Sequence, residues 1–303
     1  MKKLFFPVVL AATIILGGVL AYTIWTAKPL TAQAYYESGK KYYDEKKFPE
    51  AIIQLLNAVR KDPRNRDARF YLASSFVNQQ DLTNAVGHLR ALLEYYPDDL
   101  SANLQLGAIY LTAGRTNGEF FRQAQQISEK ILARDPNSVG ALILSGNASA
   151  GLQDYRTSVN LFERALGLDP RNLSAFLSLG TTQALQKNYA EAEQAFLKAR
   201  EVNPKDKGAL ISLGNYYRAT KQFDKAEPIF KEAVALFPNE PPIYLQLVEF
   251  YNQVGRFEEA EKLLNDVQAK TQDPDPSLIL VDLYMAKDRI ADARKLLLEL
   301  KEK

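Results

Sequence analysis

The pattern of apolar and polar positions repeats itself from residue 32 onward. Prolines that follow Asp, Tyr, Asn or Phe mark the repeat most clearly, and they stand at Pro63, Pro97, Pro136, Pro170, Pro204 and Pro238. Their spacings are 34, 39, 34, 34 and 34 residues. A fixed period in this range is typical of a solenoid built from repeated supersecondary units. Since proline cannot continue a helix, each of them is expected to mark the passage from one unit to the next.

Three columns of side chains keep their place within the units. The first column is mostly glycine and consists of Gly39, Gly107, Gly146, Gly180 and Gly214. Ala73 and Val248 take the place of glycine in the second and seventh units. The second column is alanine and consists of Ala51, Ala85, Ala124, Ala192, Ala226 and Ala260. Ser158 takes the place of alanine in the fourth unit. The third is aromatic or leucine and consists of Phe48, Leu82, Phe121, Tyr155, Tyr189, Phe223 and Phe257. Small residues let two helices approach closely, so the columns predict a packed helix pair in every unit.

With this period and these columns, the sequence resembles the tetratricopeptide-repeat (TPR) family over nearly everything from Ala32 to the C-terminus. The resemblance implies an all-α fold, a right-handed α-solenoid of about eight helix-turn-helix units that occupies residues 29–303. The units are predicted to begin near residues 32, 66, 100, 139, 173, 207, 241 and 274. Because a single unit cannot bury both of its faces, neighbouring units must stack.

Two places depart from the regular repeat. Five extra residues lengthen the third unit around residues 114–120, and Phe120 has no place in the columns. Insertions in solenoids are often contact sites, although a lengthened helix with Phe120 folded onto it is the alternative. At the other end, the last helix is crowded by Leu296, Leu297, Leu298 and Leu300 without a further unit to cover them. We therefore interpret Phe120 and Leu298 as candidate secondary contacts.

The N-terminal segment has a different composition from the repeats. No charged residue occurs in residues 4–27, and residues 4–25 would form a helix about 33 Å long, enough to cross a bilayer. Lys2 and Lys3 precede the segment, and Trp25 would lie in an interfacial aromatic belt. We predict that residues 1–28 form an N-terminal signal-anchor, a transmembrane helix that contacts the membrane through residues 4–27.

A cleaved signal peptide is the alternative to this anchor. Cleavage after Ala21 would leave an apolar stub, and cleavage after Ala34 would cut into the first unit. An uncleaved anchor is therefore the interpretation that we favour. The positive charges on the two sides of the segment nearly balance, but its short Lys-Lys start resembles bacterial export signals. We expect a single-pass inner-membrane protein with a cytoplasmic N-terminus and a periplasmic, extracytoplasmic TPR domain.

Composition excludes several functions. The 303 residues are 47% hydrophobic and 24% charged, as in globular proteins. Without the three lysines at positions 2, 3 and 28, the chain has 35 basic and 36 acidic residues, which leaves no positive field for nucleic acid. It has no cysteine and a single histidine, His88, and no phosphate loop or hydrolase motif occurs. We expect no enzymatic activity, no cofactor, no metal and no small-molecule substrate.

The TPR resemblance places the binding surface on the concave face, which is lined by the first helix of each unit. The fifth, ninth and twelfth positions of these helices combine an apolar stripe with a row of short polar groups. The candidate residues are Phe70, Ser74, Leu104, Ile143, Asn147, Leu177, Thr181, Ile211, Asn215, Arg218, Leu245 and Asn252. Amides can bond an extended peptide backbone as donor and as acceptor. The alternative is that the stripe only packs and the groove is solvated.

Some TPR domains hold chaperone C-terminal carboxylates with a clamp of Asn and paired cations. Asn147 and Asn215 match the Asn position of that clamp, but the cations are missing, so this activity is not expected. The sequence instead predicts a non-catalytic membrane-anchored TPR scaffold that binds other proteins or extended peptide segments for assembly or biogenesis of a cell-envelope complex. The alternatives are a constitutive accessory subunit of a larger membrane complex, or a regulatory partner of an envelope enzyme such as a glycosyltransferase.

Overall fold

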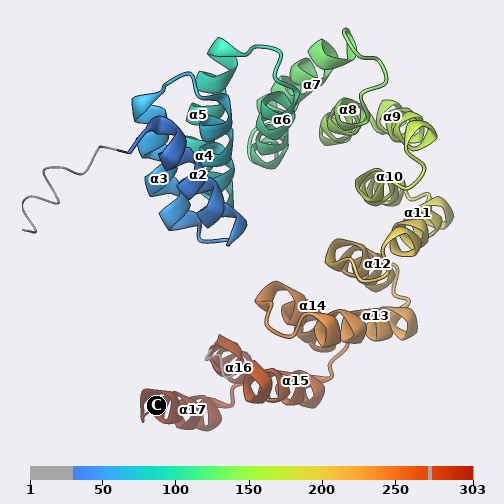
Figure 1. Ribbon diagram of the computed structural model, residues 1–303. Helices are drawn as coiled ribbons and strands as arrows, with labels where there is room; N and C mark the ends of the chain where they lie inside the picture. Colours follow the sequence, from blue (N-terminus) through green and yellow to red (C-terminus); the bar gives the residue numbers. More distant parts are fainter. Residues whose placement is uncertain (1–29, 272–274, 303) are drawn as a thin grey trace, which may run out of the picture. The chain divides into compact units, whose positions relative to one another are not determined.

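The computed structural model describes residues 30–271 and 275–302, which fold into sixteen helices without a strand (Figure 1). In chain order they are α2 (Ala32–Asp44), α3 (Phe48–Lys61), α4 (Arg66–Asn78), α5 (Leu82–Tyr95), α6 (Leu100–Gly114), α7 (Glu119–Leu132), α8 (Val139–Gly151), α9 (Tyr155–Leu168), α10 (Leu173–Leu185), α11 (Tyr189–Val202), α12 (Lys207–Ala219), α13 (Phe223–Leu236), α14 (Pro241–Gln253), α15 (Phe257–Thr271), α16 (Asp275–Ala286) and α17 (Ile290–Glu302). The expected all-α repeat fold is therefore confirmed.

The predicted anchor, residues 1–28, lies outside the described residues. Among the helices of residues 30–271 and 275–302, none is both long enough and apolar enough to pass through a bilayer. The chain forms two compact units, an N-terminal block that ends at Ile109 and a C-terminal block that begins at Tyr110.

Short polar residues begin many of the helices. The N–H of Ala175 donates to Asn172 Oδ1 at 3.0 Å before α10, and the N–H of Ala209 donates to Asp206 Oδ1 at 2.8 Å before α12. Such caps satisfy backbone donors that have no partner inside the helix. The turn between the two helices of most units contains one residue in the left-handed region, namely Lys46, Gln80, Gln153, Lys187, Lys221, Gly255 or Asp288. These turns reverse the direction of the chain, so the two helices of a unit pack against each other.

Large side chains from the second helix of the same unit pack against the glycine column. A Cβ on Gly146 would lie 2.5 Å from the ring of Phe162, and a Cβ on Gly214 would lie 2.6 Å from the ring of Phe230. Both rings are fully buried. The alanine column is buried as well, with Ala192, Ala226 and Ala260 at zero exposure. The small residues therefore make room for a large side chain of the partner helix, a ring in the units of Gly146, Gly180 and Gly214 and Leu55 in the unit of Gly39.

The first helices of the C-terminal block lie on one side of it. Contacts join α8 to α10, α10 to α12 and α12 to α14, and no comparable contacts join successive second helices in the described part of the chain. Figure 1 shows α9, α11, α13 and α15 on the outer side of this row. One continuous apolar core runs from α11 to α17 and includes the buried faces of α12 and α14. The block consequently curves with its first helices on the inner side.

The third unit places two of its five extra residues in a longer first helix and the other three between that helix and Phe121. Helix α6 has 15 residues, whereas most first helices have 13. The ring of Phe120 is half-buried and lies 5.6 Å from the ring of Tyr110. Phe120 therefore packs in part on α6, as in the alternative given above, and its role as a secondary contact stays a prediction. The next ring, Phe121, lies where a Cβ on Gly114 or Gly151 would clash with it.

Candidate partner-binding surface

The predicted groove residues of the N-terminal block are used mainly for packing. Ser74 is only 5% exposed, and its hydroxyl donates to the carbonyl of Phe70 at 3.0 Å. The side-chain amide of Gln105 donates to the same hydroxyl at 3.0 Å. Phe70 and Leu104 are half-buried. Ser74 thus has no free hydrogen-bonding capacity at the surface, contrary to the prediction that it belongs to an accessible polar row.

The C-terminal block carries an aliphatic stripe on its first helices. Ile143, Leu177, Ile211 and Leu245 occupy the fifth positions of α8, α10, α12 and α14, and all four are half-buried. Each packs against the buried core with part of its side chain. The other part stays exposed, so the stripe serves both packing and contact with another molecule.

A polar row lies beside this stripe at the ninth helical positions. Asn147 is half-exposed and makes no hydrogen bond within the described residues. Thr181 is exposed and donates its hydroxyl to the carbonyl of Leu177 at 2.9 Å, which leaves the oxygen free to accept. Asn215 has an enclosed Oδ1 without a partner. The stripe residues Ile143, Leu177 and Ile211 together with Asn147, Thr181 and Asn215 are called the first-helix surface below.

Charge enters only at the far end of the first-helix surface. Arg218 Nη1 pairs with Glu249 Oε2 at 3.0 Å, where the side chains are 19% and 62% exposed. This pair joins the twelfth position of α12 to the ninth position of α14. Asn252 follows and is exposed. Arg218 is therefore already neutralised by a neighbour, and the middle of the surface carries no charged side chain from these positions.

Groups of three or more His, Cys, Asp or Glu side chains placed for a metal ion do not occur in residues 30–271 and 275–302. His88 is half-buried and stacks on Phe76, with ring centroids 5.6 Å apart. Burial, and secondarily the charge of Arg69, lowers the pKa of His88. This half-buried imidazole, stacked on Phe76, fits a packing role.

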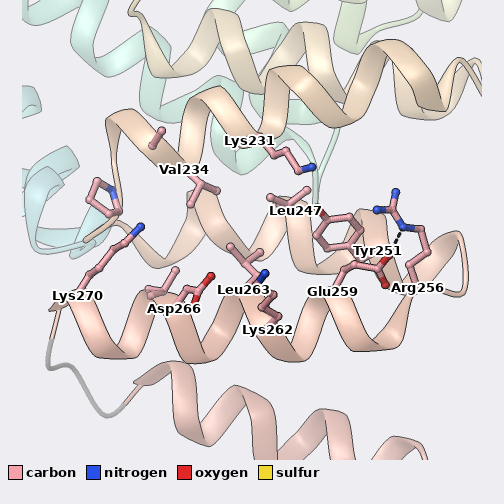
Figure 2. Close-up of a pocket in the computed structure, with 13 residues that line it drawn as sticks. Lys231, Val234, Leu247, Tyr251, Arg256, Glu259, Lys262, Leu263, Asp266 and Lys270 are labelled. Atoms are coloured by element: carbon pink, nitrogen blue, oxygen red, sulfur yellow. Dashed lines mark hydrogen bonds and ion pairs between the residues drawn. The ribbon is translucent and has the colours of Figure 1, made fainter.

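A second concavity was not expected from the sequence. Figure 2 shows it between α13 and α15, where Leu247 and Tyr251 from α14 also line it. Its volume is about 480 Å³. Val234 and Leu263 form apolar walls, and Lys231, Arg256, Glu259, Lys262, Asp266 and Lys270 form the polar lining. We call it the α13/α15 groove. The period of the sequence gives no sign of such a gap, because the period marks what the units share.

The sequence profile of the tetratricopeptide-repeat family matches residues 36–94, 72–130, 143–206 and 192–241, and a second profile of the same family matches residues 217–278. These ranges cover more than half of the chain. The protein belongs to the tetratricopeptide-repeat family.

Known relatives share parts of the chain or its fold. The human protein O-mannosyl-transferase TMTC3 is 30% identical over 112 residues, which are 37% of this chain but only 12% of the human protein. The crystal structure of yeast Tom70 superposes with a TM-score of 0.65 at 18% identity and covers 90% of this chain and 60% of that one. PilW, a type IV pilus biogenesis factor, superposes with a TM-score of 0.58 at 20% identity, over 71% of this chain and 98% of that one. At such identities the two structures show the fold alone.

Proposed function

We propose that the protein is a non-catalytic scaffold that holds an extended segment of a partner protein on its first-helix surface. The observation that carries this proposal is the row of half-exposed aliphatic side chains beside Asn147, whose amide has no partner in the described structure. An extended segment can bury apolar side chains on the stripe. Its backbone N–H and C=O groups can then bond to Asn147 and Thr181, because an amide and a hydroxyl serve as donor and acceptor.

We also propose that the N-terminal segment anchors the protein in a membrane. The uncharged segment of residues 4–27 supports a single inner-membrane anchor with a cytoplasmic N-terminus and periplasmic repeats. PilW, which shares the fold, is a pilus biogenesis factor, and this likeness is the reason to propose assembly of an envelope complex as the role. An intact anchor predicts resistance to carbonate extraction and a native mass that includes residues 1–21. A mature protein that starts at residue 22 or 35 would overturn the anchor without affecting the partner-binding proposal.

Site-specific photo-crosslinking tests the binding surface. A photoreactive amino acid at position 147 of the full-length chain in native membranes should crosslink to a partner protein. The matched control carries the same amino acid at position 197 on α11, where Leu197 is exposed on a second helix. Crosslinks from position 147 and none from position 197 would support the proposal. Crosslinks from position 197 alone would place the contact elsewhere.

A second candidate is an accessory role beside a glycosyltransferase. The observation that favours it is the 30% identity over 112 residues with a human O-mannosyl-transferase, of which this chain spans 12%. A constitutive enzyme subunit stays stoichiometric with its enzyme through detergent and salt. Purification of the tagged chain from native membranes followed by mass spectrometry therefore distinguishes this role from a scaffold that exchanges its partners.

A further inference from the structure

The α13/α15 groove exists because one ion pair of the neighbouring repeat is not repeated. Between α11 and α13, Arg200 Nη2 pairs with Glu232 Oε2 at 2.6 Å and spans the gap between two second helices. One period of 34 residues later, Val234 stands where Arg200 stands, and Asp266 stands where Glu232 stands. Valine cannot reach across, so the gap between α13 and α15 stays open.

The exposed part of the groove is apolar in its centre. Val234 and Leu263 are half-buried and face each other from α13 and α15 in Figure 2. Leu247 and Val267 also line the groove and are only 2% exposed. A volume of about 480 Å³ lies within the range of pockets that enclose a ligand or a few side chains. The groove can therefore take one or two apolar side chains of another molecule.

The charges of the groove are paired at one end and unpaired at the other. Lys231 pairs with Glu227 at 2.7 Å, and Arg256 pairs with Glu227 and Glu259 at 2.6 and 2.7 Å. Lys262 and Lys270 make no ion pair or hydrogen bond within the described residues, and Asp266 between them makes none either. Two free ammonium groups against one free carboxylate leave this end of the groove positive.

We propose that the α13/α15 groove is a second interaction surface that takes a short acidic segment of a partner protein. An apolar side chain of the segment lies between Val234 and Leu263, and its carboxylates lie against Lys262 and Lys270. The groove lies on the second helices of the C-terminal block, and the first-helix surface lies on the first helices. Both surfaces can be occupied at once, which suits a scaffold that brings two partners together. The inference does not depend on what the first-helix surface binds.

Selection from a phage-displayed library of random short peptides on the full-length chain tests the proposal. We expect enrichment of peptides in which Asp or Glu flanks Leu, Ile or Phe. Val234→Arg should rebuild the pair with Asp266 in the manner of Arg200 and Glu232 and close the groove. Binding of the selected peptides should then fall at least about tenfold.

A second variant keeps the test decisive if Val234→Arg perturbs the fold. Lys262→Glu/Lys270→Glu reverses the free charges at the surface, and it should also weaken the selected peptides about tenfold or more. Lys198→Glu/Lys205→Glu is the control, because it makes the same change at exposed positions of the C-terminal block outside the groove. Enrichment of basic or uncharged peptides, or equal binding by Lys262→Glu/Lys270→Glu and the control, would overturn the proposal. Loss of the selected peptides in Asn147→Ala/Thr181→Ala would instead assign them to the first-helix surface.

Discussion

Arg256 holds Glu227 with two hydrogen bonds across the junction between two repeats. Its Nη1 donates to Oε2 at 2.6 Å, and its Nη2 donates to Oε1 at 3.2 Å. The hydroxyl of Tyr251 donates to the same Oε1 at 3.2 Å. The Arg256 guanidinium lies 4.9 Å from the centre of the Tyr251 ring, and both side chains are drawn in Figure 2. Tyrosine, glutamate and cation thus connect α13, α14 and the turn before α15 in one network.

The same arrangement recurs at the two neighbouring junctions. Tyr284 and Arg289 donate to Glu261 at 2.6 and 2.8 Å. Tyr217 and Lys225 donate to Glu193 at 2.9 and 3.1 Å. Earlier units have no glutamate at this position of the second helix, where they carry Ile52, Val86, Gln125 and Val159. We call the arrangement the tyrosine bracket, and it is specific to the last four repeats.

The tyrosine bracket predicts that loss of the Glu227 carboxylate costs more stability than loss of the Glu259 carboxylate. Glu227→Gln should lower the free energy of unfolding of the C-terminal block by about 1–2 kcal/mol, because it leaves Arg256 with a weakened, partly buried partner. Glu259→Gln removes a more exposed carboxylate from the same arginine and should cost less than about 0.5 kcal/mol. Urea unfolding followed by circular dichroism measures both. Equal losses would mean that the bracket contributes no more than a surface ion pair.

Acid should weaken the same junction. The hydrogen bonds from Arg256 lower the pKa of Glu227 from its ordinary 4.5 to about 2. A carboxyl whose pKa is lowered in the folded state stabilises the fold above the unfolded pKa, and this stability is lost as the pH falls from about 4.5 through about 2. The protection factors of the amides in α13–α15, which are the exchange rates corrected for the intrinsic rate at each pH, should therefore fall in this window. Glu227→Gln should show a smaller fall in protection than the unmodified chain, and unchanged protection in the unmodified chain would contradict the assignment.

Alkali should act on the phenols of the bracket. Burial and the hydrogen bond to its glutamate raise the pKa of Tyr217 and of Tyr284 to about 12. The unfolded chain loses these protons near pH 10, so the folded state loses stability as the pH rises from about 10 through about 12. Ultraviolet titration should resolve a late group of tyrosines. Glu193→Gln should move one tyrosine, Tyr217, to an earlier midpoint.

Two glycines offer a matched test of the packing. A Cβ on Gly214 would meet the Phe230 ring at 2.6 Å, whereas nothing lies within 4 Å of a Cβ on Gly167. Gly214→Ala should cost about 1–3 kcal/mol through overpacking, as should Ala226→Leu in the fully buried alanine column. Gly167→Ala should stabilise α9 by up to about 1 kcal/mol, because alanine is the better helix former. Thermal unfolding decides, and destabilisation by Gly167→Ala would contradict the register of α9.

The sequence period predicted the repeats because packing requires small residues at the same place in every unit. It did not predict what occupies the space beside them, which is a buried ring such as Phe162 or Phe230 in some units and Leu55 in the first. The polar row was predicted only in part for a similar reason. Gln105 is long enough to reach Ser74 from the next first helix, whereas the equivalent neighbour of Asn147 is the short Ser178. Contacts between units depend on such differences, which a common period does not contain.

We expect truncation of Asn215 to keep or raise the stability of the fold and to weaken partner binding. Its Oδ1 is enclosed without a hydrogen-bond partner, which costs about 1–3 kcal/mol in the folded state. Asn215→Ala removes this acceptor, so the variant should be as stable as the original chain or more stable by up to about 1 kcal/mol. A residue retained only for packing would destabilise the fold when truncated. Thermal unfolding of Asn215→Ala therefore distinguishes a residue that stabilises the fold by packing from one that does not.

The binding half of this prediction uses the partner that is crosslinked from position 147. Asn147→Ala should leave stability unchanged, because Asn147 makes no hydrogen bond within the described residues. Each of the two truncations should weaken capture of the partner by about 0.5–1.5 kcal/mol, the value of one hydrogen bond. Added salt should change the affinity little, because the stripe and its polar row carry no charge. Normal capture by the double variant Asn147→Ala/Asn215→Ala, or a steep dependence on salt, would remove the first-helix surface from consideration and leave the α13/α15 groove as the contact.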